Sequence, residues 1–225
     1  MSIGFFVTGT DTGVGKTLVA CALLEALRAA GRRAVGMKPV AAGSERGRWA
    51  DVDALSQASG VRAPPRAVNP YAFEPAIAPH LAARKAGIAI DLANIVAAFR
   101  ELGALADVVV VEGAGGLLVP LGERETMADL ARALQVPAVL VVGMRLGCLN
   151  HALLTRAALA ACGVPCAGWV ANCCAPEMEE LAGNVGTLAE RLDCPLLGEI
   201  PYRPGLAPRD AARFLDLRKL PGRHG

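Results

Sequence analysis

The sequence has few charged residues and no long apolar run. Only 20% of its 225 residues are charged, while 53% are hydrophobic. No apolar stretch reaches the roughly 18 residues that span a bilayer, so we expect no membrane partner. The arginines are scattered and the net charge is only +2, so the basic patch of a nucleic-acid-binding protein is missing. Low charge combined with many small and aliphatic residues favours an α/β fold with a buried sheet.

The seven cysteines follow no metal-binding or redox spacing. Their number is odd, and neither a zinc pattern nor a Cys-x-x-Cys pair occurs. We therefore expect free, mostly buried thiols in a reducing compartment. Residues 1–7 contain no basic leader and no cleavage site, which predicts a cytoplasmic protein.

Short apolar runs alternate with longer helical stretches along the chain. The expected strands cover residues 3–8, 33–38, 108–111, 138–142, 167–171 and 196–200. The expected helices cover residues 16–30, 127–134, 149–161 and 177–192. This alternation predicts right-handed βαβ units in a doubly wound, mostly parallel sheet, and the length fits a single domain over residues 1–225. The proline-rich segment 43–79 is less regular, and we expect it to cover the site within that domain.

A glycine-rich turn joins the first expected strand to the first expected helix. It reads GTDTGVGKT over residues 9–17. In such loops backbone N–H groups surround phosphate oxygens, the lysine reaches the β- and γ-phosphates, and the Thr17 hydroxyl coordinates Mg²⁺. The spacing is unusual, because Gly9 lies one residue earlier than in the common phosphate-binding loop. The nucleotide-binding residues predicted from this loop are Thr12, Gly13, Val14, Gly15, Lys16 and Thr17.

Charged and polar side chains also stand at the ends of other expected strands. Lys38 should lie beside the phosphate loop, because neighbouring strands usually pair, and a second cation suits phosphoryl transfer. Glu112 follows four valines and precedes a glycine-rich turn, where a Mg²⁺-binding acid is expected. Asp53 is a candidate to complete the metal shell, although Asp51 and Asp53 are both also explained as acids at a helix start. Asn172 offers a donor and an acceptor to an adenine edge, but asparagine is also common in turns.

Seven short motifs in order along nearly the whole chain resemble the dethiobiotin synthetase family. They are FVTGTDTGVGKT (6–17), KPV (38–40), VEGAGG (111–116), VVG (141–143), LGCLNH (146–151), GWVAN (168–172) and LGEIP (197–201). The resemblance implies a P-loop NTPase fold and an ATP- and Mg²⁺-dependent ligase of biotin biosynthesis. Its substrates would be 7,8-diaminopelargonic acid, CO2 and ATP. A carbamate forms on one amine, its oxygen attacks the γ-phosphate, and the second amine then closes a ring and expels phosphate.

The resemblance also implies roles for individual residues. Lys16 and Lys38 match the family's phosphate- and carbamate-binding lysines, and the matching metal ligands are Thr17, Asp53 and Glu112. Beyond the phosphate loop, the implied ATP contacts are Asp53, Glu112, Gly113, Ala114, Gly115, Asn172, Cys173, Pro201, Tyr202 and Arg203. The implied substrate contacts are Lys38, Ala42, Gly147, Cys148 and Asn150.

The chain departs from the family pattern at several positions. Ala42 stands where the family commonly has a substrate-contacting serine or threonine, and Cys173, Arg203 and residues 204–210 also differ. The resemblance further implies a homodimer, in which the loop 143–151 reaches the substrate of the partner subunit. Taken from the residues alone, that loop is an ordinary strand-to-helix connection.

Two other classes of P-loop ATPase fit part of the pattern. Partition and cell-division ATPases resemble residues 13–17, but they carry a signature lysine where this chain has Asp11. The proline and glycine in residues 217–222 also interrupt any long amphipathic helix there. The synthetase half of cobyrinate-type amidotransferases continues into a glutaminase domain, which we do not expect in a chain of this length. The dethiobiotin synthetase interpretation is therefore favoured over both.

Overall fold

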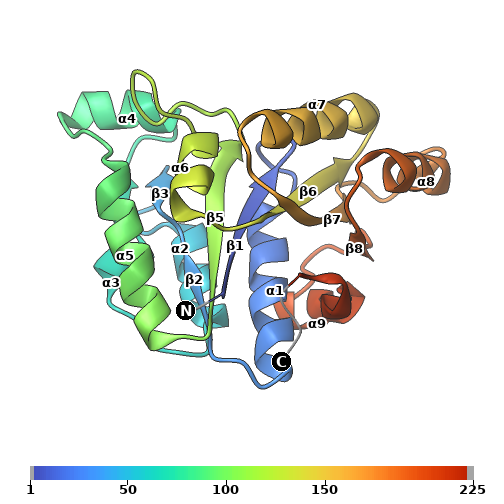
Figure 1. The fold of residues 1–225 in the computed structure, drawn as a ribbon, viewed down its shortest axis with the longest axis horizontal. Helices are drawn as coiled ribbons and strands as arrows, with labels where there is room; N and C mark the ends of the chain where they lie inside the picture. The colour runs from blue at the N-terminus through green and yellow to red at the C-terminus, as the bar shows by residue number, and fades with distance from the viewer. Residues whose placement is uncertain (1–2, 222–225) are drawn as a thin grey trace.

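One parallel sheet of six strands forms the centre of the molecule in the computed structural model (Figure 1). The model describes residues 3–221. Residues 1–2 and 222–225 belong to the predicted domain 1–225 but lie outside the described residues, as does residue 222 of the tail segment 217–222. The strands are β1 (Ile3–Gly9), β2 (Ala34–Met37), β5 (Val108–Gly116), β6 (Ala138–Met144), β7 (Cys166–Cys173) and β8 (Leu196–Ile200). Their order across the sheet is β2-β5-β1-β6-β7-β8, and every neighbouring pair is parallel. The prediction of a doubly wound α/β sheet is confirmed.

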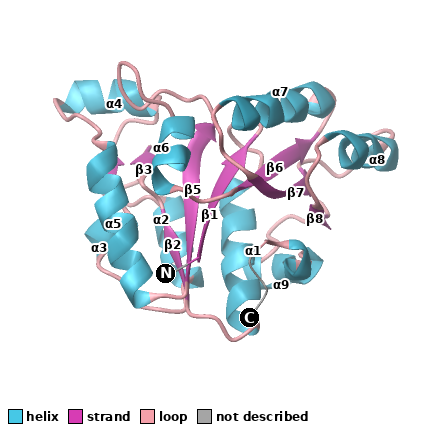
Figure 2. Cartoon of the chain, in the orientation of Figure 1, coloured by secondary structure: helices cyan, strands magenta, loops and turns pink. Residues whose placement is uncertain are grey.

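Helices cover both faces of this sheet (Figure 2). Because successive side chains of a strand point to opposite faces, Phe5 and Val7 of β1 join one hydrophobic core and Phe6 joins another. The first face carries α1 (Lys16–Ala29), α2 (Ala50–Ala58) and α9 (Pro208–Ala211). The second carries α5 (Leu92–Leu105), α6 (Met127–Leu134), α7 (Cys148–Ala161) and α8 (Leu181–Arg191).

The segment 43–79 is more regular than expected. β3 (Val40–Ala42) leads into it and pairs in parallel with β4 (Tyr71–Phe73). Besides α2, it contains α3 (Pro65–Val68), and α4 (Pro79–Ala86) follows it. Val68 and Phe73 are buried in the same core as Phe6 of the main sheet. The segment is therefore packed onto the sheet, where it can hold residues near the strand ends.

The strand order corrects one step of the sequence argument. We expected Lys38 beside the phosphate loop because β1 and β2 would pair, but β5 lies between them and pairs with both. The carboxyl ends of β1, β5 and β2 still meet at one edge of the sheet, where ligands bind in folds of this kind. Lys38 therefore lies near the phosphate-binding loop, next to the end of β5.

Two further expectations from composition can be compared with the structure. All seven cysteines are free, as predicted, but only Cys21 and Cys148 are buried and the other five are half-buried. Among the helices of residues 3–221, none is long and apolar enough to cross a membrane.

Candidate functional site

The phosphate-binding loop connects β1 to α1, and a residue from β7 supports it. Gly13 and Gly15 have φ values of 75° and 90°, a left-handed conformation that glycine adopts without strain. No side chain caps the N-terminus of α1, so its first backbone N–H groups are left to face an anion. Asn172 donates from Nδ2 to the carbonyl oxygen of Val14 at 2.8 Å, and any side chain at Gly15 would collide with it. Asn172 therefore fixes the shape of the loop.

Lys16, the first residue of α1, is buried and folds back onto this loop. Its Nζ donates to the backbone carbonyl of Asp11 at 2.8 Å. Burial lowers the pKa of Lys16 to about 8, and the nearby positive charge of Lys38 adds to this effect. The two cations thus lie close enough to repel each other. A bound phosphate, being negatively charged, would reduce this repulsion.

Lys38 and Glu112 form a buried ion pair where β2 and β5 come together. Lys38 Nζ lies 2.7 Å from Glu112 Oε1, 2.8 Å from Asp51 Oδ2 and 3.2 Å from the carbonyl oxygen of Gly113. Thr17 Oγ1 donates to the same Glu112 Oε1 at 2.9 Å. Burial by itself would lower the pKa of Lys38, but the carboxylates of Glu112 and Asp51 outweigh it and the pKa is raised. The two carboxylates therefore favour the charged form of Lys38.

These groups open onto one cavity of about 740 Å³. Its polar part includes Lys16, Lys38, Asp51 and Glu112, together with Thr12, Gly13, Gly15, Thr17 and Gly115 of the two glycine-rich turns. Its apolar part consists of Val40, Ala42, Ala76, Ile77, Ala78, Pro79, Ala114 and Val119. A site with a charged half and an apolar half suits a substrate that combines polar reacting groups with an aliphatic chain.

Segment 43–79 contributes to the wall of this cavity, as expected, but the sequence did not show which of its residues line it. The wall formed by residues 76–79 lies just before and at the start of α4, and its only signal was a run of small apolar residues ahead of a helix. The acid that lines the cavity is Asp51 and not Asp53. The Asp53 carboxylate points to Arg48, with Oδ2 2.9 Å from its Nε in an exposed pair. The structure thus does not bring Asp53 together with Thr17 and Glu112.

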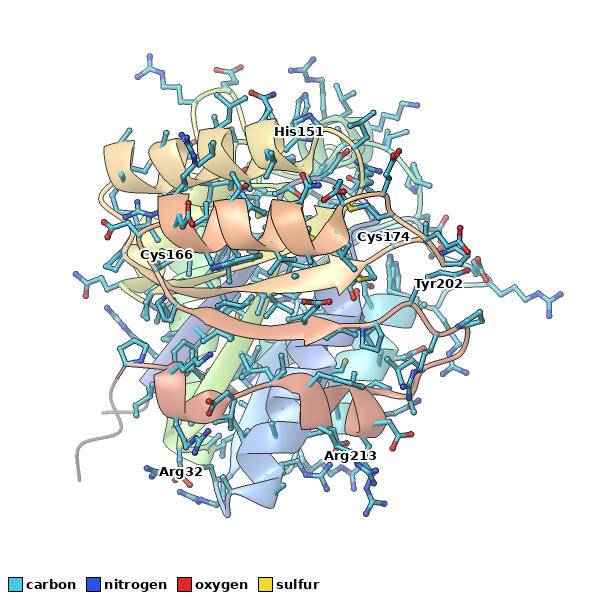
Figure 3. The ribbon with its side chains drawn as sticks, turned by 90° about the vertical axis from the view of Figure 1, so that its right-hand side faces the viewer. Arg32, His151, Cys166, Cys174, Tyr202 and Arg213 are labelled. Atoms are coloured by element: carbon cyan, nitrogen blue, oxygen red, sulfur yellow. The ribbon has the colours of Figure 1, made fainter. Side chains whose placement is uncertain are left out.

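The residues expected near the nucleotide base lie at the ends of β7 and β8, outside the lining of this cavity. Cys173 is the last residue of β7, and Pro201, Tyr202 and Arg203 directly follow β8. Figure 3 shows Tyr202 and Cys174 toward the same end of the strands. The guanidinium carbon of Arg203 lies 5.6 Å from the centre of the Phe214 ring.

The residues expected to contact a partner's substrate lie at the N-terminus of α7. Gly147 takes a left-handed conformation before the helix, Cys148 is buried and Asn150 is exposed. Leu146 is 99% exposed, whereas Leu149 packs against the core of its own chain. None of Gly147, Cys148 and Asn150 lines the cavity of the same chain.

Comparisons with known proteins show which family the chain resembles. A family model described as an AAA domain matches residues 4–210. The chain is 55% identical over 220 residues to the ATP-dependent dethiobiotin synthetase of Nitrosospira multiformis, covering 98% of this chain and 97% of that protein. It is 52% identical to the synthetase of Aromatoleum aromaticum, with 97% of both chains covered. It is 53% identical to that of Xanthomonas axonopodis pv. citri, with 95% and 97% covered.

Solved structures of P-loop NTPases share the fold at low identity. The septum site-determining protein MinD from Pyrococcus horikoshii, complexed with Mg-ADP, matches with a TM-score of 0.58 and 17% identity, covering 98% of this chain and 87% of that one. The signal recognition particle receptor FtsY from Elizabethkingia anophelis matches with a TM-score of 0.57 and 16% identity, covering 95% and 65%. At these identities the likeness concerns the fold alone.

Proposed function

The chain belongs to the ATP-dependent dethiobiotin synthetase family, and we propose that its cavity is where 7,8-diaminopelargonic acid, CO2 and ATP react. It is an ATP-dependent carbon–nitrogen ligase of biotin biosynthesis on a P-loop NTPase fold. One observation carries the site assignment: two buried lysines and a buried carboxylate face a cavity that also has an apolar wall. The aliphatic chain of the diamine fits that apolar wall, which leaves its amines beside the lysines.

In this proposal the substrate supplies the nucleophiles and the protein supplies charge and position. One amine takes up CO2 as a carbamate, whose oxygen attacks the γ-phosphate of ATP to give a carbamic-phosphoric anhydride and ADP. The second amine then attacks the carbonyl carbon, which closes the ring and expels phosphate. Lys16 holds the phosphate oxygens, and Lys38 stabilises the charge that develops between carbamate and phosphate.

The donor set at Glu112 fits Mg²⁺. Glu112 Oε2 is buried and has no hydrogen-bond partner among the described residues, while Thr17 Oγ1 lies 2.9 Å from the other oxygen. A hard dication with oxygen ligands and several waters suits this arrangement. We assign Thr17 and Glu112 as its ligands and keep Asp53 as the third, which must first leave its exposed pair with Arg48, a weak interaction. Bound Mg²⁺ neutralises charge on the β- and γ-phosphates.

The same proposal extends to nucleotide contacts, assembly and location. Asn172, Cys173, Pro201, Tyr202 and Arg203 are assigned to the side of the phosphate loop that receives the base. The protein acts as a single domain over residues 1–225, works in the cytoplasm and forms a homodimer.

Support for the homodimer comes from exposed leucines near the loop 143–151. Leu118 and Leu154 border one groove beside the phosphate loop and are 58% and 61% exposed, and Leu146 is almost fully exposed. Apolar side chains at this density favour contact with another protein surface. In the dimer Gly147, Cys148 and Asn150 would bind the substrate of the partner subunit, where the N-terminus of α7 offers free N–H groups to its carboxylate.

Product formation tests the proposal directly. Incubation with the diamine, MgATP and ¹³C-bicarbonate should yield dethiobiotin that is one mass unit heavier, with one ADP per product. Reactions lacking ATP or the diamine are the controls. If no dethiobiotin forms while DNA or lipid stimulates ATP hydrolysis, the chain is instead an ATPase of the partition type.

A further inference from the structure

We propose that Asp51 is a positioning residue for Lys38, which holds the Lys38 ammonium in the cavity when the metal ion occupies Glu112. This inference rests on the proposed function, because it concerns the lysine assigned to carbamate and phosphate. The residues predicted from the sequence as metal, ATP or substrate contacts do not include Asp51.

The Asp51 carboxylate is itself held in place by α2. Asp51 lies in the first turn of α2, and its Oδ1 accepts a hydrogen bond from the backbone N–H of Val52 at 2.9 Å. Its Oδ2 lies 2.8 Å from Lys38 Nζ, and the side chains of Lys38 and Asp51 are 6% and 28% exposed. Each carboxylate oxygen thus has one partner, so the carboxylate presents a fixed negative charge to the lysine.

The backbone of Lys38 is fixed from the other side. Its N–H donates to the carbonyl oxygen of Val68 at 2.8 Å, and its carbonyl oxygen accepts from Asn69 Nδ2 at 2.7 Å. Since the main chain is held, the location of the ammonium depends on the side-chain torsions and on the anions at its end. These anions are Glu112 and Asp51.

Metal binding changes the balance between the two anions. Glu112 Oε1 serves both Lys38 and Thr17 in the structure, and Glu112 and Thr17 are the proposed Mg²⁺ ligands. A dication on this carboxylate offsets its attraction for Lys38 and also repels the ammonium. Asp51 is then the remaining carboxylate in contact with Lys38 among the described residues. Without it, the ammonium keeps only the neutral Gly113 carbonyl at 3.2 Å.

Asp53 provides a matched comparison on the same helix. It also lies in the first turn of α2, but its partner is the exposed Arg48 and it does not line the cavity. Neutralising Asp51 should therefore release the Lys38 ammonium, whereas neutralising Asp53, the third proposed Mg²⁺ ligand, should weaken metal binding instead. Asp51→Glu restores the negative charge and should recover part of the Lys38 NMR signal and of the turnover that Asp51→Asn loses.

The chain holds only four lysines, Lys16, Lys38, Lys85 and Lys219, so their ammonium groups can be followed individually by ¹H–¹⁵N NMR. In the Mg-ADP complex of the full chain, we expect a slowly exchanging Lys38 signal, identified by its loss in Lys38→Arg. Asp51→Asn should broaden or remove this signal, while Asp51→Glu should retain part of it. Turnover of Asp51→Asn should fall by roughly 10–100-fold with KM for ATP changed less than about twofold, as expected for lost transition-state stabilisation.

The affinity for Mn²⁺, measured in the ADP complex by electron paramagnetic resonance, shows whether Asp51 positions Lys38 or binds the metal ion. It should be unchanged in Asp51→Asn. A tenfold weaker affinity would place Asp51 in the metal shell and overturn the inference, as would an unchanged Lys38 signal or unchanged turnover. If the wild-type chain makes no dethiobiotin, the proposed function fails, but the NMR comparison still decides whether Asp51 holds Lys38.

Discussion

Replacing Lys38 with glutamine removes the cation that we place nearest to the reacting carbamate and phosphate. Lys38 is 4% exposed, so solvent screens its charge only weakly. Loss of one preorganised donor at a developing oxyanion typically lowers kcat by about 10²–10³-fold, or roughly 2.7–4 kcal/mol. We therefore expect Lys38→Gln to lower turnover at least about 100-fold.

The same substitution must also destabilise the fold, and the two effects have to be separated. The side chains of Lys38 and Glu112 are 6% and 2% exposed, so solvent does not screen this pair. Removing one partner of a buried pair costs roughly 3–5 kcal/mol. At about 2–4 °C per kcal/mol for a chain of this size, the Tm should fall by roughly 6–20 °C.

The assay follows ¹³C-labelled dethiobiotin well below the Tm of the variant, after circular dichroism has shown that the variant is folded. Binding of Mg-ADP provides an independent check that the phosphate loop is intact. Lys38→Arg keeps the charge and should retain more stability than Lys38→Gln. Near-normal turnover in a folded Lys38→Gln protein would refute the assigned role, whatever happens to the Tm.

Three other outcomes follow from the site and the core. Glu112→Gln should raise the Mg²⁺ concentration needed for half-maximal turnover by at least tenfold, and an unchanged metal titration would remove Glu112 from the shell. A mixture of Lys16→Gln and Asn150→Ala subunits should regain part of the lost activity after subunit exchange; a monomer in ultracentrifugation, or no recovery after proven exchange, would contradict the shared site. Burial, followed by the charges of Glu112 and Glu25, raises the pKa of the Cys21 thiol from 9.0 to about 12. The folded thiol then keeps its proton to higher pH than the unfolded one, so stability is lost as pH rises from 9 toward 12, by about 1 kcal/mol at pH 10; urea unfolding at pH 8 and 10 should show this extra loss in the wild type but not in Cys21→Ala.

Elements with a strong local signal were predicted well. The apolar run of β8 and the helical pattern of α6 have the predicted bounds, Leu196–Ile200 and Met127–Leu134. Both signals come from neighbouring residues alone, because a buried parallel strand is continuously apolar and an amphipathic helix repeats about every 3.6 residues. The phosphate loop was found for the same reason, since its function depends on consecutive residues.

Features that depend on distant residues were not accessible in this way. β5 lies between β1 and β2 because of the way the crossover connections run. No local sequence pattern encodes the course of these connections. β3 and β4 are three residues each, too short for a strand period to be recognised. Asp51 and Asp53 are two positions apart on a helix, which turns their side chains about 200° away from each other. Only the docking of α2 decides which of them faces the cavity.

The hydrogen bond from Lys16 to the Asp11 carbonyl bears on how the enzyme passes from one catalytic cycle to the next. A buried ammonium without any acceptor would be costly, and here the loop itself provides a neutral one at 2.8 Å. In the role proposed for Lys16, an arriving phosphate oxygen, being charged, makes the stronger bond and takes over the ammonium. When the products depart, the carbonyl receives it back. The Lys16 ammonium therefore has an acceptor both with and without a bound phosphate.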